Sequence, residues 1–333
     1  MIKIKEALFY ERLEEDKVKC LLCPHECRIM PGRTGICRMR RNLEGKLVSL
    51  NYGRLAALAL DPIEKKPFYH FYPGKNILSA GTAGCNFSCG FCQNYHLAHE
   101  IPDLYEVDLS GLVAVTMDAQ RKDSIGLAFT YNEPLIWYEY VLETAEILKN
   151  ENLKTVLVTN GYIKKKPLKR LLPCIDALNI DVKAFTDEFY RRNCRGDLKT
   201  VMQTVEEAAL TGHVEITTLI IPGENDSEEE LRNLSRWLAE LNPDIPLHFS
   251  RYYPAYKFTS SPTPEGTLKK ARDIAKEYLN FVYLGNLPGE QNNTPCLNCG
   301  NILIKRDGYK TQFVNFENGK CRSCGAEAYY IKM

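Results

Sequence analysis

The sequence lacks any marked imbalance of charge. Its 43 lysine and arginine residues meet 42 acidic residues, which leaves a formal net charge of +1. Such a balance gives no strong signal for nucleic-acid binding or for an anionic membrane surface. The sequence also lacks an apolar run of the roughly 18 residues that a membrane span needs, and its start lacks the apolar core of a signal peptide. These absences lead us to expect a soluble, cytoplasmic protein without a membrane partner.

Cysteine, by contrast, is abundant, with 13 residues. Disulfides are rare in the reducing cytosol, so metal ligation explains this number better. The cysteines form an N-terminal, a central and a C-terminal set, whereas Cys174 and Cys194 stand alone. So many soft ligands favour an anaerobic setting.

The central set consists of Cys85, Cys89 and Cys92, separated by three and then two residues. Three thiolates from one loop can bind three corners of a [4Fe–4S] cluster, whereas a cluster that only carries electrons usually has four. One iron would therefore keep an open position for a substrate or cofactor. The alternative, a structural zinc site, needs four ligands, and this loop offers three.

The C-terminal set has the spacing of a zinc ribbon. Two Cys-x2-Cys turns, Cys296 with Cys299 and Cys321 with Cys324, are separated by 21 residues. Two such turns close a tetrahedron around one Zn²⁺, with a rubredoxin-like iron site as the alternative. A four-thiolate site has no open position, so we expect a structural role.

The N-terminal set is looser and comprises Cys20, Cys23, Cys27 and Cys37, with His25 as a spare ligand. Four thiolates could hold zinc or a second [4Fe–4S] cluster. The spacing leaves both possibilities open.

Between residues 75 and 285, short apolar runs alternate with longer periodic segments, which predicts a parallel α/β sheet. Six or seven such units are too few for an eight-fold barrel and fit a partial, open one. Expected strands are 76–80, 125–130, 155–159, 178–183, 214–221, 247–252 and 281–284, and expected helices are 134–150, 198–210, 227–241 and 264–279. We predict an N-terminal cysteine-rich segment (1–60), the partial barrel (61–289) and a zinc-ribbon module (290–333).

One expected strand, 178–183, has a polar face. Alternation places Asn179, Asp181 and Lys183 on one side and apolar residues on the other. A buried parallel strand should be nearly all apolar. The polar face therefore indicates a wet or ligand-filled cavity, with a solvated edge strand as the alternative.

The cysteine motif, with Phe91 directly before its third cysteine, resembles that of the radical S-adenosylmethionine (SAM) family. The resemblance implies a partial (βα)6-type barrel and SAM chelated to the open iron by its amino and carboxylate groups. One electron would then cleave SAM into methionine and a 5′-deoxyadenosyl radical. Phe91 would pack against the adenine ring.

The run from Tyr131 to Pro134 resembles the Gly-Gly-Glu-Pro motif of this family, which implies that Asn132 and Glu133 hold the SAM amino group. Tyr131 and Asn132 depart from the two glycines of that motif. A plain helix start is the alternative, since proline suits the first turn and a carboxylate complements the helix dipole.

Two further matches resemble the activases of glycyl radical enzymes. Thr159 and Asn160 match their Thr-Asn-Gly turn at a strand end. The pair Asp181 and Lys183 matches their Asp-x-Lys pair, which implies that Lys183 meets the SAM carboxylate and Asp181 orients the lysine or a cation.

Taken together, the motifs closely resemble the radical SAM component of the AmmeMemoRadiSam system, a homologue of pyruvate formate-lyase activating enzyme. That resemblance implies AMMECR-type and Memo-type partners and a ferredoxin- or flavodoxin-type electron donor. We expect an oxidoreductase that abstracts hydrogen from an unidentified substrate. The alternatives are a glycyl-radical-enzyme activase and a non-catalytic, metal-binding RNA-binding or scaffold protein.

Overall fold

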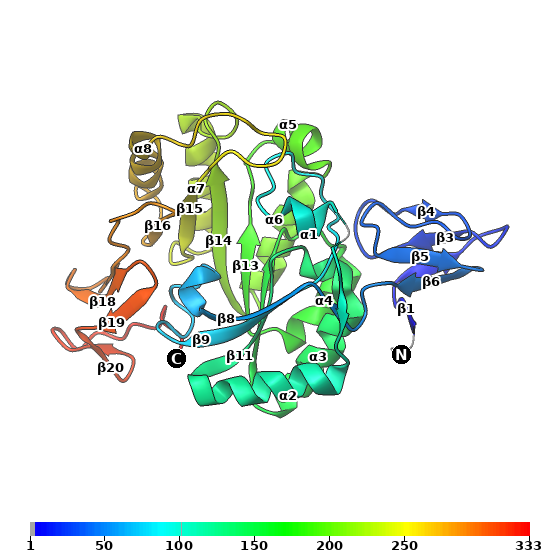
Figure 1. The fold of residues 1–333 in the computed structure, drawn as a ribbon. Helices are drawn as coiled ribbons and strands as arrows, with labels where there is room; N and C mark the ends of the chain where they lie inside the picture. Colours follow the sequence, from blue (N-terminus) through cyan, green and yellow to red (C-terminus); the bar gives the residue numbers. More distant parts are fainter. Residues whose placement is uncertain (1–3, 101) are drawn as a thin grey trace.

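The computed structural model describes residues 4–100 and 102–333. Its centre is an eight-stranded sheet with the order β16-β15-β14-β13-β12-β11-β9-β8 (Figure 1). The sheet is parallel from β9 to β16, and only β8 runs antiparallel to its neighbour. The strands are β8 (Ala57–Pro62), β9 (Asn76–Gly81), β11 (Ser124–Phe129), β12 (Lys154–Thr159), β13 (Ala177–Asp181), β14 (His213–Ile220), β15 (Leu247–Arg251) and β16 (Val282–Gly285). This open sheet confirms the predicted α/β partial barrel and all seven expected strands, and adds β8.

Helices connect the parallel strands, and several begin at a capping side chain. Asp108, Asp197 and Ser227 each accept a hydrogen bond from a backbone N–H three residues further on, which stabilises the first turn. The longer helices are α2 (Leu109–Ala119), α3 (Tyr138–Asn150), α4 (Lys165–Leu171), α6 (Leu198–Ala209), α7 (Glu228–Leu241) and α8 (Glu265–Ala275), and the short ones are α1 (Tyr95–Ala98) and α5 (Asp187–Phe189). The helix expected from residue 134 starts as a 3-10 turn, Pro134–Trp137, and becomes α-helical at Tyr138.

The N-terminal module, which contains β1 to β7 (residues 5–55), packs on one side of the barrel through a buried ion pair. Arg40 and Glu139 of α3 are 1% and 0% exposed and form two hydrogen bonds of 2.9 and 2.8 Å. Removing one partner would leave an uncompensated buried charge, so the pair fixes the module in place. Its strands are β1 (Lys5–Glu6), β2 (Tyr10–Arg12), β3 (Val18–Cys20), β4 (Arg28–Ile29), β5 (Arg40–Leu43), β6 (Lys46–Ser49) and β7 (Arg54–Leu55), which pairs with β10 (Tyr105–Glu106).

The C-terminal module lies on the opposite side (Figure 1). Arg306 of this module crosses the junction, because it donates to the Tyr69 carbonyl at 2.5 Å and lies 4.5 Å from the ring centroid of Tyr69. The strands of the module are β17 (Thr294–Pro295), β18 (Ile302–Asp307), β19 (Lys310–Phe313), β20 (Phe316–Glu317) and β21 (Lys320–Cys321).

The segment that leads into the barrel is ordered and packed, with Phe68 and Phe71 buried. The division expected after residue 60 falls inside β8, so the first barrel strand begins in the preceding segment. Within the described part of the chain, no helix is long and apolar enough to cross a bilayer.

Candidate functional site

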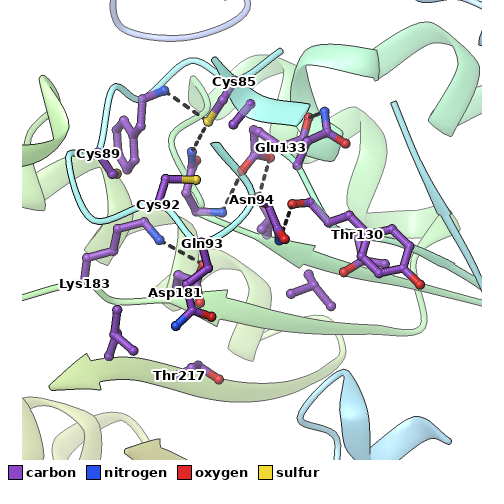
Figure 2. A pocket seen from close by; sticks show the side chains of 18 of the residues that line it. Cys85, Cys89, Cys92, Gln93, Asn94, Thr130, Glu133, Asp181, Lys183 and Thr217 are labelled. Carbon is purple, nitrogen blue, oxygen red and sulfur yellow. Dashed lines mark hydrogen bonds and ion pairs between the residues drawn. The ribbon is translucent and has the colours of Figure 1, made fainter. Parts of the chain in front are cut away.

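A cavity of about 460 Å³ lies at the carboxyl ends of the barrel strands, and its size suits a small cofactor. The polar residues at several strand ends, far apart in the sequence, meet there because parallel strands end at one edge. The predicted residues that line it are Cys85, Phe91, Cys89, Cys92, Asn132, Glu133, Thr159, Asn160, Asp181 and Lys183. Figure 2 shows the three cysteines together near one end of the cavity, with Lys183 and Asp181 beside them.

The cysteine loop is held by hydrogen bonds from neighbouring strand ends. Asn132 accepts from the Thr82 N–H at 3.0 Å and donates to the Gly84 carbonyl at 2.9 Å. Asn132 therefore supports the backbone just before Cys85. The Cys85 sulfur accepts from the Phe87 N–H at 3.3 Å.

The loop's thiols suit a cationic metal cluster. Burial raises the pKa of Cys85 and raises that of Cys92 to about 11, so without a metal both stay neutral at pH 7. Iron would deprotonate them, as it does other thiol ligands. Three thiols that line one cavity, with Cys89 buried and Cys85 and Cys92 half-buried, are a donor set that fits a three-cysteine [4Fe–4S] cluster.

Glu133 is both a helix start and a lining residue. Its carboxylate accepts from the Leu135 N–H at 2.8 Å, the Thr159 hydroxyl at 2.7 Å and the Asn160 N–H at 2.8 Å. The helix-start interpretation is therefore correct without excluding a role in the cavity. Burial raises the pKa of Glu133 to about 7, despite these three donors. A cation bound nearby would stabilise the ionised form.

Asp181 and Lys183 form an ion pair at the end of β13, with 3.0 Å between Lys183 Nζ and Asp181 Oδ2. Burial opposes the ammonium charge, but Asp181 and Cys89 raise the pKa of Lys183, so the lysine stays charged. Asn179, on the same face of β13, is engaged elsewhere. Its amide oxygen accepts from Thr217 Oγ1 at 2.8 Å, and its amide nitrogen donates to the Pro67 carbonyl at 2.7 Å.

A buried charged group that also lines the cavity was not predicted from the sequence. Lys66 is 3% exposed, pairs with Asp61 at 2.7 Å and lies 4.4 Å from the ring centroid of Tyr131. Tyr131 donates its hydroxyl to the same carboxylate at 2.7 Å. Lys65 also pairs with Asp61, and both lysines line the cavity. The charged run between Pro62 and Pro67 is the sequence feature from which a charged cavity wall could have been predicted.

Tyr131 occupies a backbone conformation that glycine favours, with φ of 72°. A side chain in this region costs roughly 1–2 kcal/mol. The contacts of Tyr131 with Asp61 and Lys66 offset that cost, which explains how this chain carries tyrosine where the resembling motif has glycine.

The C-terminal cysteines form a closed set. Cys296 and Cys324 sulfurs are 3.7 Å apart, as are those of Cys299 and Cys321, and all four lie within 4.8 Å of one another. This arrangement could hold one tetrahedral metal ion, and zinc is the ion that such a set commonly binds.

The fold and the cavity define an α/β enzyme that joins a cysteine loop to a polar ligand site at the strand ends. The pattern of the Radical SAM superfamily matches residues 80–235. An uncharacterized protein of Methanocaldococcus jannaschii is 41% identical over 332 residues, covering 97% of this chain and 98% of that protein. The chain belongs to the radical SAM superfamily.

Other similar proteins are more distant. A putative glycyl-radical enzyme activating enzyme of Methanocaldococcus jannaschii is 28% identical over 60% of this chain and 77% of its own length. A radical SAM methyltransferase of Sphaerobacter thermophilus has the same fold, with a TM-score of 0.52 and 14% identity, over 84% of this chain and 76% of that one.

Proposed function

We propose that Cys85, Cys89 and Cys92 hold a [4Fe–4S] cluster next to bound SAM, and that the protein abstracts hydrogen from a substrate that enters the same cavity. When bound, the cluster supplies the electron that cleaves SAM into methionine and the 5′-deoxyadenosyl radical. The observation that carries the proposal is the meeting of the three cysteines with Glu133 and the Asp181–Lys183 pair on one cavity.

The charged residues suit the two ionic groups of the methionine part of SAM. Lys183 supplies an ammonium for the carboxylate, and Asp181 holds that ammonium in place at 3.0 Å. Glu133, fixed by Thr159 and Asn160, supplies a carboxylate for the amino group. These groups orient SAM rather than react with it.

The remaining residues position the adenine and the loop. Phe91 is 4% exposed and lines the cavity, where an aromatic face suits a purine ring. Asn132 supports the cysteine loop from behind through Thr82 and Gly84.

A neighbouring cavity offers a route for the substrate. It shares Lys65, Gln93, Thr217 and Ser250 with the first cavity, and its far wall includes Tyr309 of the C-terminal module. We infer that a substrate reaches the radical through this second cavity, between the barrel and the module.

A second candidate function is activation of a glycyl radical enzyme. It is favoured by the likeness to the putative activating enzyme of Methanocaldococcus jannaschii. A glycyl radical detected by electron paramagnetic resonance after mixing with a candidate partner enzyme would support activation of a glycyl radical enzyme as the function.

We further propose a ferredoxin- or flavodoxin-type electron donor, AMMECR-type and Memo-type partners, and zinc at the four C-terminal cysteines. The motif resemblance supports the partners, and the close sulfur set supports zinc. A cytoplasmic location belongs to the same proposal, since no disulfide joins any of the thirteen cysteines, all of which lie in the described residues.

The direct experiment is anaerobic incubation with SAM and dithionite. The proposal predicts release of 5′-deoxyadenosine, whereas a non-catalytic scaffold protein would release none. Transfer of deuterium from a labelled candidate substrate to 5′-deoxyadenosine would then identify the hydrogen donor.

A further inference from the structure

The four N-terminal cysteines surround a single internal cavity. Cys20, Cys23 and Cys27 come from the end of β3 and the turn that leads to β4, and Cys37 comes from the loop before β5. The other lining residues are largely apolar and include Leu22, Ile29, Ile36 and Ile136. Four soft ligands thus line one small space in the N-terminal module.

Their spacing differs from that of the C-terminal set. Among the residues described, the four C-terminal cysteines are the only set of three or more possible metal ligands whose ligand atoms all lie within 4.8 Å of one another. In a tetrahedral Zn²⁺ site, sulfur atoms lie about 3.8 Å apart. Around a [4Fe–4S] cubane they lie about 6 Å apart, because the cluster fills the space between them. The wider N-terminal set therefore fits a cluster better than a single ion.

Arg40 provides a second, independent indication of an anionic ligand. It lines the cavity and is 1% exposed, and its Nε is buried without a hydrogen-bond partner among residues 4–100 and 102–333. Its other two nitrogens bind Glu139. An unpaired buried N–H is costly, so a sulfide or thiolate acceptor in the cavity would satisfy it.

We propose that Cys20, Cys23, Cys27 and Cys37 bind a second [4Fe–4S] cluster, with one cysteine on each iron. With no open iron, this cluster cannot bind SAM and is suited to electron transfer.

The N-terminal site adjoins the radical loop. Asn86, the residue after Cys85, lines the N-terminal cavity, and its carbonyl lies 2.7 Å from His25 Nε2. Gly84 packs so closely that a Cβ there would lie 2.6 Å from the Cys37 carbonyl oxygen. The second cluster is placed to take one electron from a flavodoxin- or ferredoxin-type donor and pass it to the radical cluster. This relay rests on the proposed function, whereas the site itself does not.

The test removes the radical loop's ligands and leaves the N-terminal module intact. We expect the anaerobically reconstituted Cys85→Ala/Cys89→Ala/Cys92→Ala protein to keep about four iron and four sulfide per chain, with a cluster signal that SAM does not change. Wild type and a Cys174→Ala control should hold about eight of each. A triple variant without labile sulfide, with zinc in its place, would overturn the site.

The complementary variant tests the relay. The Cys20→Ala/Cys23→Ala/Cys37→Ala protein should lose flavodoxin-driven SAM cleavage by at least about tenfold and keep the SAM-induced spectral change of the radical cluster. Undiminished flavodoxin-driven cleavage would contradict the relay. If this variant does not fold, the iron and sulfide content of the loop variant still decides whether the site exists.

Discussion

The C-terminal and central cysteine sets offer the same type of ligand in different surroundings. At the C-terminus, four sulfurs lie within 4.8 Å of one another, and two pairs are 3.7 Å apart. In the central loop, three cysteines border a cavity of about 460 Å³ that also holds Glu133, Asp181 and Lys183. The first set can complete a metal's coordination by itself, while the second leaves room for another molecule. Ligand number and surroundings, more than ligand type, separate structure from catalysis.

The largest effect should come from the central set. Cys89→Ala should reduce SAM cleavage to background, because two remaining thiolates cannot hold the catalytic cluster. Release of 5′-deoxyadenosine under anaerobic conditions measures this, with Cys174→Ala as the matched control at wild-type rate. Equal turnover in the Cys89 variant would contradict the site.

A smaller effect is expected at the polar wall of the cavity. Lys183→Met should weaken SAM binding by about 10- to 100-fold, the usual value of a charge-assisted hydrogen bond. Equilibrium binding to the reconstituted protein measures it, and the exposed Lys276→Met serves as control. Unchanged affinity would show that Lys183 does not meet the SAM carboxylate.

The pH dependence of SAM binding sharpens the role of Glu133. Its pKa is raised by burial from 4.5 to about 7, so the SAM ammonium finds an ionised partner mainly above pH 7. Affinity should increase about tenfold from pH 6 to pH 8, and Glu133→Gln should flatten this dependence. The same shift makes Glu133 destabilise the SAM-free fold increasingly as pH rises from 4.5 to 7. An affinity independent of pH in the wild type would exclude this role.

The smallest effect on SAM cleavage should come from the C-terminal set. Cys321→Ala should lose the metal and lower the melting temperature by roughly 5–10 °C, because metal binding there contributes to folding. Cleavage at 25 °C should stay within about twofold of wild type. Thermal denaturation and 5′-deoxyadenosine release, measured side by side, separate the two outcomes. A complete loss of SAM cleavage in a folded Cys321→Ala protein would show that the C-terminal cysteines are needed for catalysis.

Much of the barrel could be predicted because its signals are local. Apolar runs marked all seven parallel strands, and the alternation of Asp181 and Lys183 with apolar neighbours indicated a polar cavity before any fold was known. The strand β8 was missed although residues 55–60 form a continuous apolar run, because that run consists of alanine and leucine, which favour helices over strands.

The rest of the site depends on contacts between distant segments. Nothing near Lys66 in the sequence indicates that it lies over Tyr131, and nothing near Asn132 indicates that it supports the backbone of Thr82 and Gly84. Likewise, the spacing of the N-terminal cysteines left zinc and a cluster equally open. The cluster is favoured by two features of the fold: these sulfurs do not form the close set seen at the C-terminus, and Arg40 Nε is buried without a partner in the described residues.

Mössbauer spectroscopy of ⁵⁷Fe-reconstituted protein tests the central claim most directly. Adding SAM should change the signal of one iron in the cluster bound by Cys85, Cys89 and Cys92, and Cys89→Ala should remove that change. The account would be contradicted if the loop bound only zinc in oxygen-free preparations, or if SAM changed the Mössbauer signal of none of the irons in the cluster.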